Sequence, residues 1–269
     1  MREPLPADLA EALRATASRR GSFGDPAIFF TETGSTNDVA ATLAERGATE
    51  GTAVIALSQT AGRGRFGREW FSPPGAGVYV SVICRNRQAA PYLTLAGGVA
   101  VADGIRRATG LPVQIKWPND IVVADSGIRG RRRKLAGILA EASSGPDGMQ
   151  HVVLGFGINL RPAAYPPEIA GRASSIETEL GRAADAGPVL AETLVALAEM
   201  MEPLAAGSPQ PVLDRWRALA PSARGTSVAW ETPSGSLTGV SAGIADDGAL
   251  LVRVGNRIER VISGELRWE

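Results

Sequence analysis

Apolar residues gather in six short runs between residues 27 and 160, each bounded by glycine, proline or charged residues. The runs are rich in valine, isoleucine and aromatic residues, a composition typical of strands. They predict strands at 27–32, 53–58, 77–84, 113–117, 136–141 and 151–160. Six strands spread over this length indicate one sheet with helices placed between them.

Other segments carry apolar residues at helical spacing. A helix is predicted over 6–20, and another over 35–47, where Ser35 or Thr36 supplies the N-cap oxygen and Gly47 ends the helix. The segment 92–110 predicts a helix whose two internal glycines suggest close packing. Two apolar stripes predict core helices near the C-terminal third: Leu190, Leu194, Leu197, Met201 and Leu204, then Val212, Leu213, Trp216 and Leu219.

The pattern changes after residue 221. Short strand-like runs at 227–232, 237–244, 249–254 and 257–262 are separated by the turn sequences PSGS, DDG and GN. This spacing predicts a small all-β barrel or sandwich. We therefore divide the chain into an N-terminal helical extension (1–26), a larger α+β domain (27–221) and a C-terminal β domain (222–269).

Composition narrows the class of protein. A chain of 269 residues that is 44% hydrophobic can bury a full core without disulfides or structural metals. Lys plus Arg and Asp plus Glu are equal at 28 each, so any cationic site is local. Cys84 and His151 are the only residues of their types, which argues against disulfides and a histidine-rich metal site. No long apolar span or signal peptide is evident, so we expect a soluble cytoplasmic protein without membrane contact.

The loop QTAGRGRFGREW, residues 59–70, places Gly62, Gly64 and Gly67 in the spacing of a dinucleotide-binding turn. That turn requires a helix beginning inside the glycine motif, because the helix N-terminus holds the pyrophosphate. Here the sequence REWFSPPGAG follows, and its consecutive prolines oppose a helix. The acidic residue expected about twenty positions later is also missing. The loop is therefore not a dinucleotide-binding turn.

Three arginines in this loop, Arg63, Arg65 and Arg68, have two explanations. On charge alone, a solvated surface loop accounts for them as well as a binding site does. The glycines favour a backbone that closes around an anion, since guanidinium groups bond phosphate and carboxylate in bidentate fashion. Because the arginines repel one another, we expect the loop to be mobile in the free protein and ordered by its ligands.

Polar residues also end three of the predicted strands. KWPNDIVV (116–123) places Lys116, Asn119 and Asp120 at a turn. KLAGILAE (134–141) begins with a lysine, and GFGINL (155–160) ends a strand with two glycines and an asparagine. Each has a plain structural explanation: a common turn, a solvated charge at a strand end and a tight bend.

Taken in order, however, GSTN (34–37), QTAGRGRFGREW (59–70), KWPND (116–120), KLAGIL (134–139) and GFGIN (155–159) resemble the ordered signature of biotin protein ligases. The resemblance runs from about residue 28 to the C-terminus. It implies an α+β fold: a mixed sheet with flanking helices, similar to class II aminoacyl-tRNA synthetases, followed by a small SH3-like β-barrel. Residues 1–26 are too few for the helix-turn-helix domain of family members that act as repressors. The chain thus resembles the monofunctional type, without specific DNA binding.

The resemblance also implies roles for individual residues. Biotin contacts are expected from Ser35, Thr36, Asn37, Gln59, Arg63, Gly64, Arg65, Lys134 and Gly137. Nucleotide contacts are expected from Arg65, Arg68, Trp70, Lys116, Asn119, Lys134 and Asn159. The expected catalytic residues are Lys134, Arg65, Arg68 and Asp120. Asp120 has two open roles, as a metal ligand or as a group that orients the attacking amine.

The implied activity is ATP-dependent conversion of biotin to biotinyl-5′-AMP, then transfer of biotin to a lysine of a biotin carboxyl carrier domain in an acyl-CoA or pyruvate carboxylase. Mg²⁺ is expected to be held mainly by the ATP phosphates. A lipoate or octanoate ligase of the same fold is the nearest alternative, and a nucleic-acid-binding protein is the non-enzymatic one. The basic segment 124–133, with Arg129, Arg131, Arg132 and Arg133, is either a flap over the site or a solvated turn.

Overall fold

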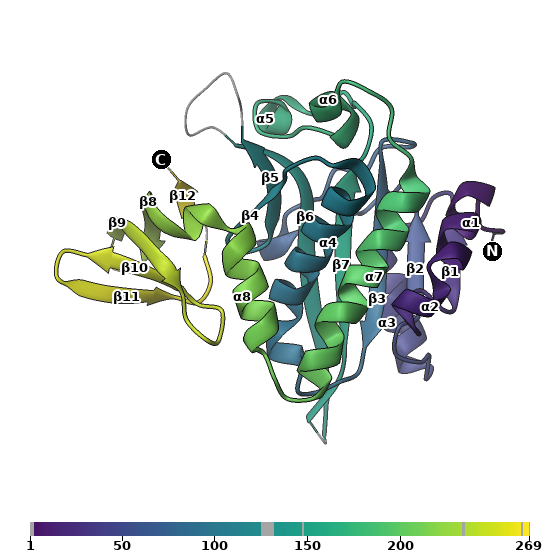
Figure 1. The fold of residues 1–269 in the computed structure, drawn as a ribbon, viewed down its shortest axis with the longest axis horizontal. Helices are drawn as coiled ribbons and strands as arrows, with labels where there is room; N and C mark the ends of the chain where they lie inside the picture. The colour runs from purple at the N-terminus through teal and green to yellow at the C-terminus, as the bar shows by residue number, and fades with distance from the viewer. Residues whose placement is uncertain (1–2, 125–131, 147, 233–234, 265, 269) are drawn as a thin grey trace.

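The structure is a computed structural model, and it describes residues 3–124, 132–146, 148–232, 235–264 and 266–268. A seven-stranded sheet forms the centre of the larger domain (Figure 1). Its strands, in spatial order, are β1 (Ala27–Phe30), β2 (Ala53–Ala56), β3 (Gly77–Cys84), β7 (Gly148–Asn159), β6 (Arg132–Gly145), β5 (Asp120–Ala124) and β4 (Gln114–Lys116). β1 and β2 pair in parallel, and the other neighbours pair antiparallel. The predicted mixed sheet is confirmed.

Long helices cover one face of this sheet. α4 (Leu93–Thr109) lies on β6 and β7, with α7 (Ala186–Ala205) and α8 (Gln210–Leu219) packed beside it (Figure 1). The two predicted apolar stripes are buried in this layer. α7 approaches α4 closely at Gly104, where a Cβ atom would lie 2.2 Å from Thr193 Oγ1. A side chain at that position would force the two helices apart.

α3 (Thr36–Glu45) packs on the opposite face, against β2, β3 and β7. A second, smaller core forms there from alternate residues of these strands, including Val54, Ile83 and Val153. Gly47 follows the helix with φ +88°, as predicted for its end. α3 covers part of this face, and the remaining part is where the predicted motifs meet.

The N-terminal extension differs from the prediction of one helix over 6–20. It forms α1 (Ala7–Ala15) and α2 (Ala17–Arg20), interrupted at Thr16. The Thr16 hydroxyl donates to the carbonyl of Ala12, so the side chain completes the end of α1. Both helices pack against α7.

Further elements follow the sheet. The segment between β7 and α7 contains two short helices, α5 (Pro167–Ala170) and α6 (Ile176–Leu180), which the apolar pattern did not predict, as it did not predict β5. No helix in the described part of the chain is long and apolar enough to cross a membrane. Arg129 and Arg131 of the basic segment lie outside the described residues.

The C-terminal domain is a five-stranded antiparallel sheet. Its strands are β8 (Arg224–Thr232), β9 (Gly235–Ile244), β10 (Leu250–Val254), β11 (Arg257–Val261) and β12 (Leu266–Trp268), in the spatial order β11-β10-β9-β8-β12. The four predicted strands are confirmed and β12 is additional; the SH3-like barrel stays a prediction. The Trp117 indole Nε1 donates to the carbonyl of Gly248 at 3.0 Å, which ties the larger domain to the β9–β10 turn.

Candidate active site

A cavity of about 280 Å³ opens on the α3 face of the sheet. Every residue that the sequence analysis assigned to the site lines this cavity: Ser35, Thr36, Asn37, Gln59, Arg63, Gly64, Arg65, Arg68, Trp70, Lys116, Asn119, Asp120, Lys134, Gly137 and Asn159. The five motifs, spread over more than a hundred residues of sequence, therefore meet at one place.

Glycines form the floor of the cavity. Gly137 of β6 pairs with Gly157 of β7, and Leu139 pairs with Gly155 two residues along the ladder. The Trp70 indole lies across the first pair, since a Cβ atom on Gly157 would be 2.3 Å from Trp70 Nε1 and one on Gly137 would be 2.9 Å from the ring. Trp70 Nε1 is buried and has no hydrogen-bond partner. Because these glycines have no side chains, the Trp70 indole can lie flat on the backbone of the sheet.

Neutral polar side chains surround one end of the cavity, which we call the polar end: Ser35, Thr36, Asn37 and Gln59. Gln59 accepts hydrogen bonds from the backbone N–H and the hydroxyl of Thr36, at 2.8 and 3.0 Å. Ser35 occupies the N-cap position of α3, but its side chain makes no capping hydrogen bond there, and neither does that of Thr36. Ser35 therefore stands at the predicted N-cap position, but the predicted capping hydrogen bond is absent, and the Thr36 hydroxyl bonds to Gln59 instead. Main-chain bonds from Thr60 and Ala61 to residues 33 and 34 hold the two loops together.

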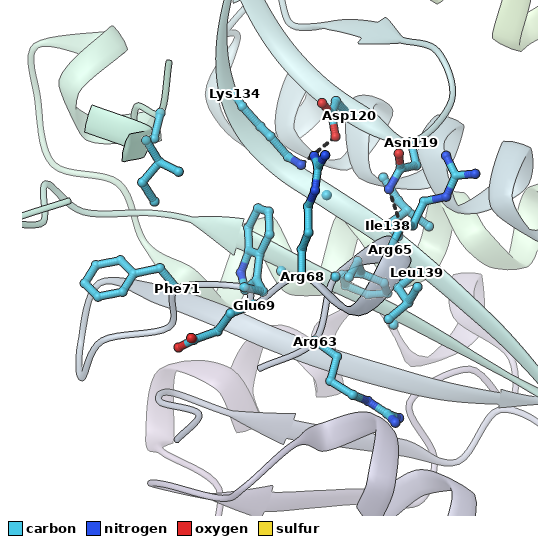
Figure 2. A pocket seen from close by; sticks show the side chains of 18 of the residues that line it. Arg63, Arg65, Arg68, Glu69, Phe71, Asn119, Asp120, Lys134, Ile138 and Leu139 are labelled. Atoms are coloured by element: carbon cyan, nitrogen blue, oxygen red, sulfur yellow. Dashed lines mark hydrogen bonds and ion pairs between the residues drawn. The ribbon is translucent and has the colours of Figure 1, made fainter. Parts of the chain in front are cut away.

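Charged side chains surround the opposite end, which we call the cationic end. Lys134 Nζ lies 2.5 Å from Asp120 Oδ1 and 4.9 Å from the centre of the Trp70 ring. Figure 2 shows Arg68 rising from the loop toward Asp120 and Lys134. Arg132 and Arg172 also line the cavity. Desolvation lowers the pKa of Lys116; Asp120 opposes that shift, while Lys134, Arg132 and Arg172 add to it. The excess of cations predicts affinity for a polyanion.

The glycine–arginine loop is a tight hairpin. Gly64 N–H donates to the carbonyl of Arg68 at 2.7 Å, and Trp70 N–H donates to that of Gly62 at 2.9 Å. At its tip, Phe66 adopts φ +58° with 64% of its surface exposed, and the Arg65 guanidinium lies 4.8 Å from its ring. No helix follows the glycine motif before β3, as predicted. Arg63 and Arg68 leave the loop in opposite directions, which reduces the repulsion expected between them (Figure 2). The loop's mobility in the free protein stays a prediction.

Some predicted residues are held by the fold rather than free in the cavity. Asn119 Nδ2 donates to the carbonyl of Ile138 at 2.7 Å, which fixes the KWPND turn to β6. Asn159 Nδ2 donates to the carbonyl of Ser174 at 3.0 Å. That bond holds the segment after β7 over the cavity, where Lys134 also pairs with Ala173.

Sequence reasoning missed part of the cavity wall. Tyr165, Ile169 and Arg172 come from the segment after β7, and Leu266 comes from the C-terminal domain. The segment carries no periodic pattern, and the apolar Leu266 looks like an ordinary core residue. Tyr165 carried no signal; burial raises its pKa to about 12. These residues could be found only once the chain was folded.

The cysteine and the histidine of the chain do not contribute to this cavity. Cys84 and His151 lie buried in β3 and β7, outside the lining, and burial raises the pKa of the Cys84 thiol. Among the described residues, no group of three or more His, Cys, Asp or Glu side chains is arranged to hold a metal ion.

Residues 29–159 match the sequence profile of the biotin/lipoate A/B protein ligase family, and residues 225–266 match that of the biotin protein ligase C-terminal domain. The chain is 33% identical to the bifunctional ligase/repressor BirA of Bacillus subtilis over 97% of this chain and 79% of that protein. It is 36% identical to a biotin–[acetyl-CoA-carboxylase] ligase of Mycobacterium tuberculosis over 87% and 86%. The biotin protein ligase of Aquifex aeolicus in complex with biotin and ATP superimposes with a TM-score of 0.75 at 27% identity, covering 90% of this chain and 98% of that one. The chain belongs to the biotin/lipoate A/B protein ligase family and, within it, to the biotin protein ligases.

Proposed function

We propose that the protein activates biotin with ATP to biotinyl-5′-AMP and then transfers biotin to a lysine of a carrier domain. The observation that carries the proposal is the division of one cavity into a neutral polar end and a cationic end, joined by the paired glycines of β6 and β7 on which the Trp70 indole lies. A molecule with a polar, uncharged head and a carboxylate tail fits this division. Beyond Lys134, the lining includes the further cations Arg132 and Arg172, which suits a nucleoside triphosphate.

The head of biotin is a ureido ring, which offers one carbonyl acceptor and two N–H donors. We assign its recognition to Ser35, Thr36, Asn37 and Gln59, with Arg63, Gly64 and Arg65 covering it. Gly137 leaves room for its chain, and Lys134 meets the carboxylate. A lipoyl or octanoyl group has no polar head, so it would leave the buried polar groups at this end without partners, at a cost of about 1–3 kcal/mol for each.

In the first step, a biotin carboxylate oxygen attacks the α-phosphorus of ATP; the bond to the bridging oxygen breaks, and pyrophosphate leaves. Both reactants are anionic, so cations must offset their repulsion. We assign this role to Lys134, Arg65 and Arg68, with Lys116 on the nucleotide side. Trp70, Asn119 and Asn159 are assigned to the nucleotide as its framing residues.

In the second step, the neutral amine of the acceptor lysine attacks the acyl carbon and AMP leaves with the anhydride oxygen. The lysine ammonium first loses one proton to solvent, and the amine nitrogen loses a second to solvent as the amide forms. Asp120 is assigned to orient it, because its carboxylate lies at the cationic end and pairs with Lys134 at 2.5 Å. No residue of the enzyme is acylated in this route.

Mg²⁺ is proposed to arrive with ATP, as the counter-ion of its phosphates. Asp120 lies at the cationic end, where it pairs with Lys134, and we assign it to the acceptor amine rather than to the metal. The proposed acceptor is the biotin carboxyl carrier domain of an acyl-CoA or pyruvate carboxylase, and the proposed compartment is the cytoplasm.

The test is pyrophosphate release measured with ATP and Mg²⁺, with and without biotin, followed by labelling of a purified carrier domain. We expect release that depends on biotin, and a biotinylated carrier. Lipoate and octanoate serve as matched substrates in the same assay. Release that ignores biotin, or that proceeds faster with octanoate, would reject the proposal.

A further inference from the structure

Glu141 lies on β6 just beyond the glycine floor and does not line the cavity. Its carboxylate oxygen Oε2 accepts two hydrogen bonds, from Asn37 Nδ2 at 2.5 Å and from the Arg63 guanidinium at 2.7 Å. The two donors belong to different motifs: Asn37 to α3 and Arg63 to the glycine–arginine loop. One carboxylate therefore joins the polar end of the cavity to the loop that covers it.

The bond to Asn37 fixes the orientation of a buried amide. On its other side, Asn37 Oδ1 accepts from the Ser81 hydroxyl at 2.5 Å, and it leaves no room for a side chain at Gly155. A carboxylate is only an acceptor, so it selects the NH2 side of the amide, while Ser81 takes the carbonyl side. The second amide hydrogen then has a defined direction.

The bond to Arg63 fixes the loop. Arg63 also forms an ion pair with Asp38 of α3 at 2.8 Å. Gly64 and Arg65, the next two residues, line the cavity. The position of Arg63 therefore sets where these two residues lie relative to the polar end.

We infer that Glu141 is a positioning residue that couples recognition of the substrate's polar head to docking of the glycine–arginine loop. It acts through Asn37 and Arg63, without touching the substrate. The predicted effect on biotin binding rests on the proposed function. The predicted effect on docking of the loop does not depend on it.

The chain offers a matched control. Asp38 binds Arg63 as Glu141 does, and no contact joins its carboxylate to Asn37. Asp38→Asn should release the loop only. Glu141→Gln should release the loop and also disturb Asn37, because a neutral amide oxygen is a weaker acceptor than the carboxylate oxygen Oε2, which accepts both bonds. With 38% of its side chain exposed, Glu141 contributes little to the core, so both variants should fold.

The experiment measures trypsin cleavage after Arg63 in the free protein and biotin affinity by calorimetry without ATP. Both variants should be cleaved several-fold faster than the wild type, while Glu141→Gln should weaken biotin binding about tenfold and Asp38→Asn less than threefold. Adenylate formation at saturating biotin should slow to a similar extent in both variants, because the released loop carries Arg65 and Arg68. Circular dichroism and the melting temperature check folding.

Wild-type cleavage and biotin affinity in Glu141→Gln would overturn the inference. So would an equal loss of biotin affinity in the two variants, because Glu141 would then act through Arg63 alone. If the wild type binds no biotin, the proposed function fails. The cleavage rates would still decide whether Glu141 docks the loop.

Discussion

Lys134 and Lys116 both line the cationic end, yet their surroundings differ. Lys134 has a carboxylate partner at 2.5 Å and an indole ring beneath it. Lys116 is desolvated among other cations, and its pKa is lowered. Lys134 is held in place by its ion pair with Asp120. The protonated form of Lys116 is destabilised by burial and by repulsion from the neighbouring cations.

Replacing Lys134 with alanine should slow adenylate formation on the order of a hundredfold, the scale expected for loss of one charged group that stabilises a transition state. Stability should change by less than about 1 kcal/mol, because the pair with Asp120 is partly exposed. Pyrophosphate release and urea unfolding measure the two effects. Parallel losses of stability and rate would contradict a role in the reaction.

Lys116 predicts a pH dependence. ATP binding favours the protonated lysine, so the affinity for ATP should fall as the pH rises through its lowered pKa. The Lys116→Arg variant keeps its charge, so its fall should begin at higher pH. The measurement is the KM for ATP between about pH 7 and about pH 10 in both proteins. Tyr165, whose pKa is raised to about 12, remains neutral over this range and provides no competing titration. If the pH profiles of KM for ATP coincide in the two proteins, Lys116 does not contribute its charge to ATP binding.

At the same scale, the sequence predicted residues that belong to short motifs and missed those that do not. Lys116 and Lys134 stand in recognisable strings, so their place at the site could be foreseen. Glu141 is the last residue of KLAGILAE, the motif that Lys134 begins, but its hydrogen-bond partners are more than seventy residues away in sequence. Only the fold brings Asn37 and Arg63 to it.

Among the elements, the paired glycines of β6 and β7 are the least replaceable feature of the cavity. The string GFGIN suggested a tight bend at the end of a strand. The structure instead shows that strand pairing continues through Gly155 and Gly157. The space that their side chains would fill is occupied by Asn37 and Trp70. The alternation of faces along a strand explains why both glycines serve the same side.

A methyl group at Gly157 should displace the Trp70 indole, since the added Cβ would lie 2.3 Å from its Nε1. Because Trp70 is assigned to the nucleotide and lies on the glycine floor between the two ends, we expect Gly157→Ala to weaken ATP binding at least tenfold, to weaken biotin binding as well, and to change the tryptophan fluorescence of the free protein. The control is Gly98→Ala in α4, where the nearest atom to the added Cβ is 3.6 Å away. That change should leave biotin binding intact and stabilise the helix by up to about 1 kcal/mol. Unaltered binding in Gly157→Ala would mean that the position of the Trp70 indole on the glycine floor does not matter for ligand binding.

At the scale of the whole molecule, the apolar pattern predicted a change to short strands after residue 221 but said nothing about how that part of the chain contacts the larger domain. Gly264 and Leu266 of the C-terminal domain line the cavity, so this small sheet helps to enclose the site. The two parts share a buried apolar core, to which Leu250 and Val252 belong, and polar contacts between them include the Trp117 bond to Gly248 and the ion pair between Arg217 and Asp246 at 3.1 Å. Such contacts join residues more than a hundred positions apart or on different elements, beyond the reach of local periodicity.

Trp117→Phe tests this docking, because it removes the indole donor and leaves the Gly248 carbonyl without its partner, at a cost of about 1–3 kcal/mol. The matched control is Trp216→Phe, since Trp216 Nε1 is buried without a hydrogen-bond partner and its loss breaks no such bond. Hydrogen–deuterium exchange should quicken at the β9–β10 turn and in β12 of Trp117→Phe, while α4 and β7 keep wild-type rates. Trp216→Phe, which alters packing among α4 and α8, should leave exchange in the C-terminal domain unchanged. If the two variants exchange alike in that domain, the Trp117 bond contributes nothing to its placement beside the cavity.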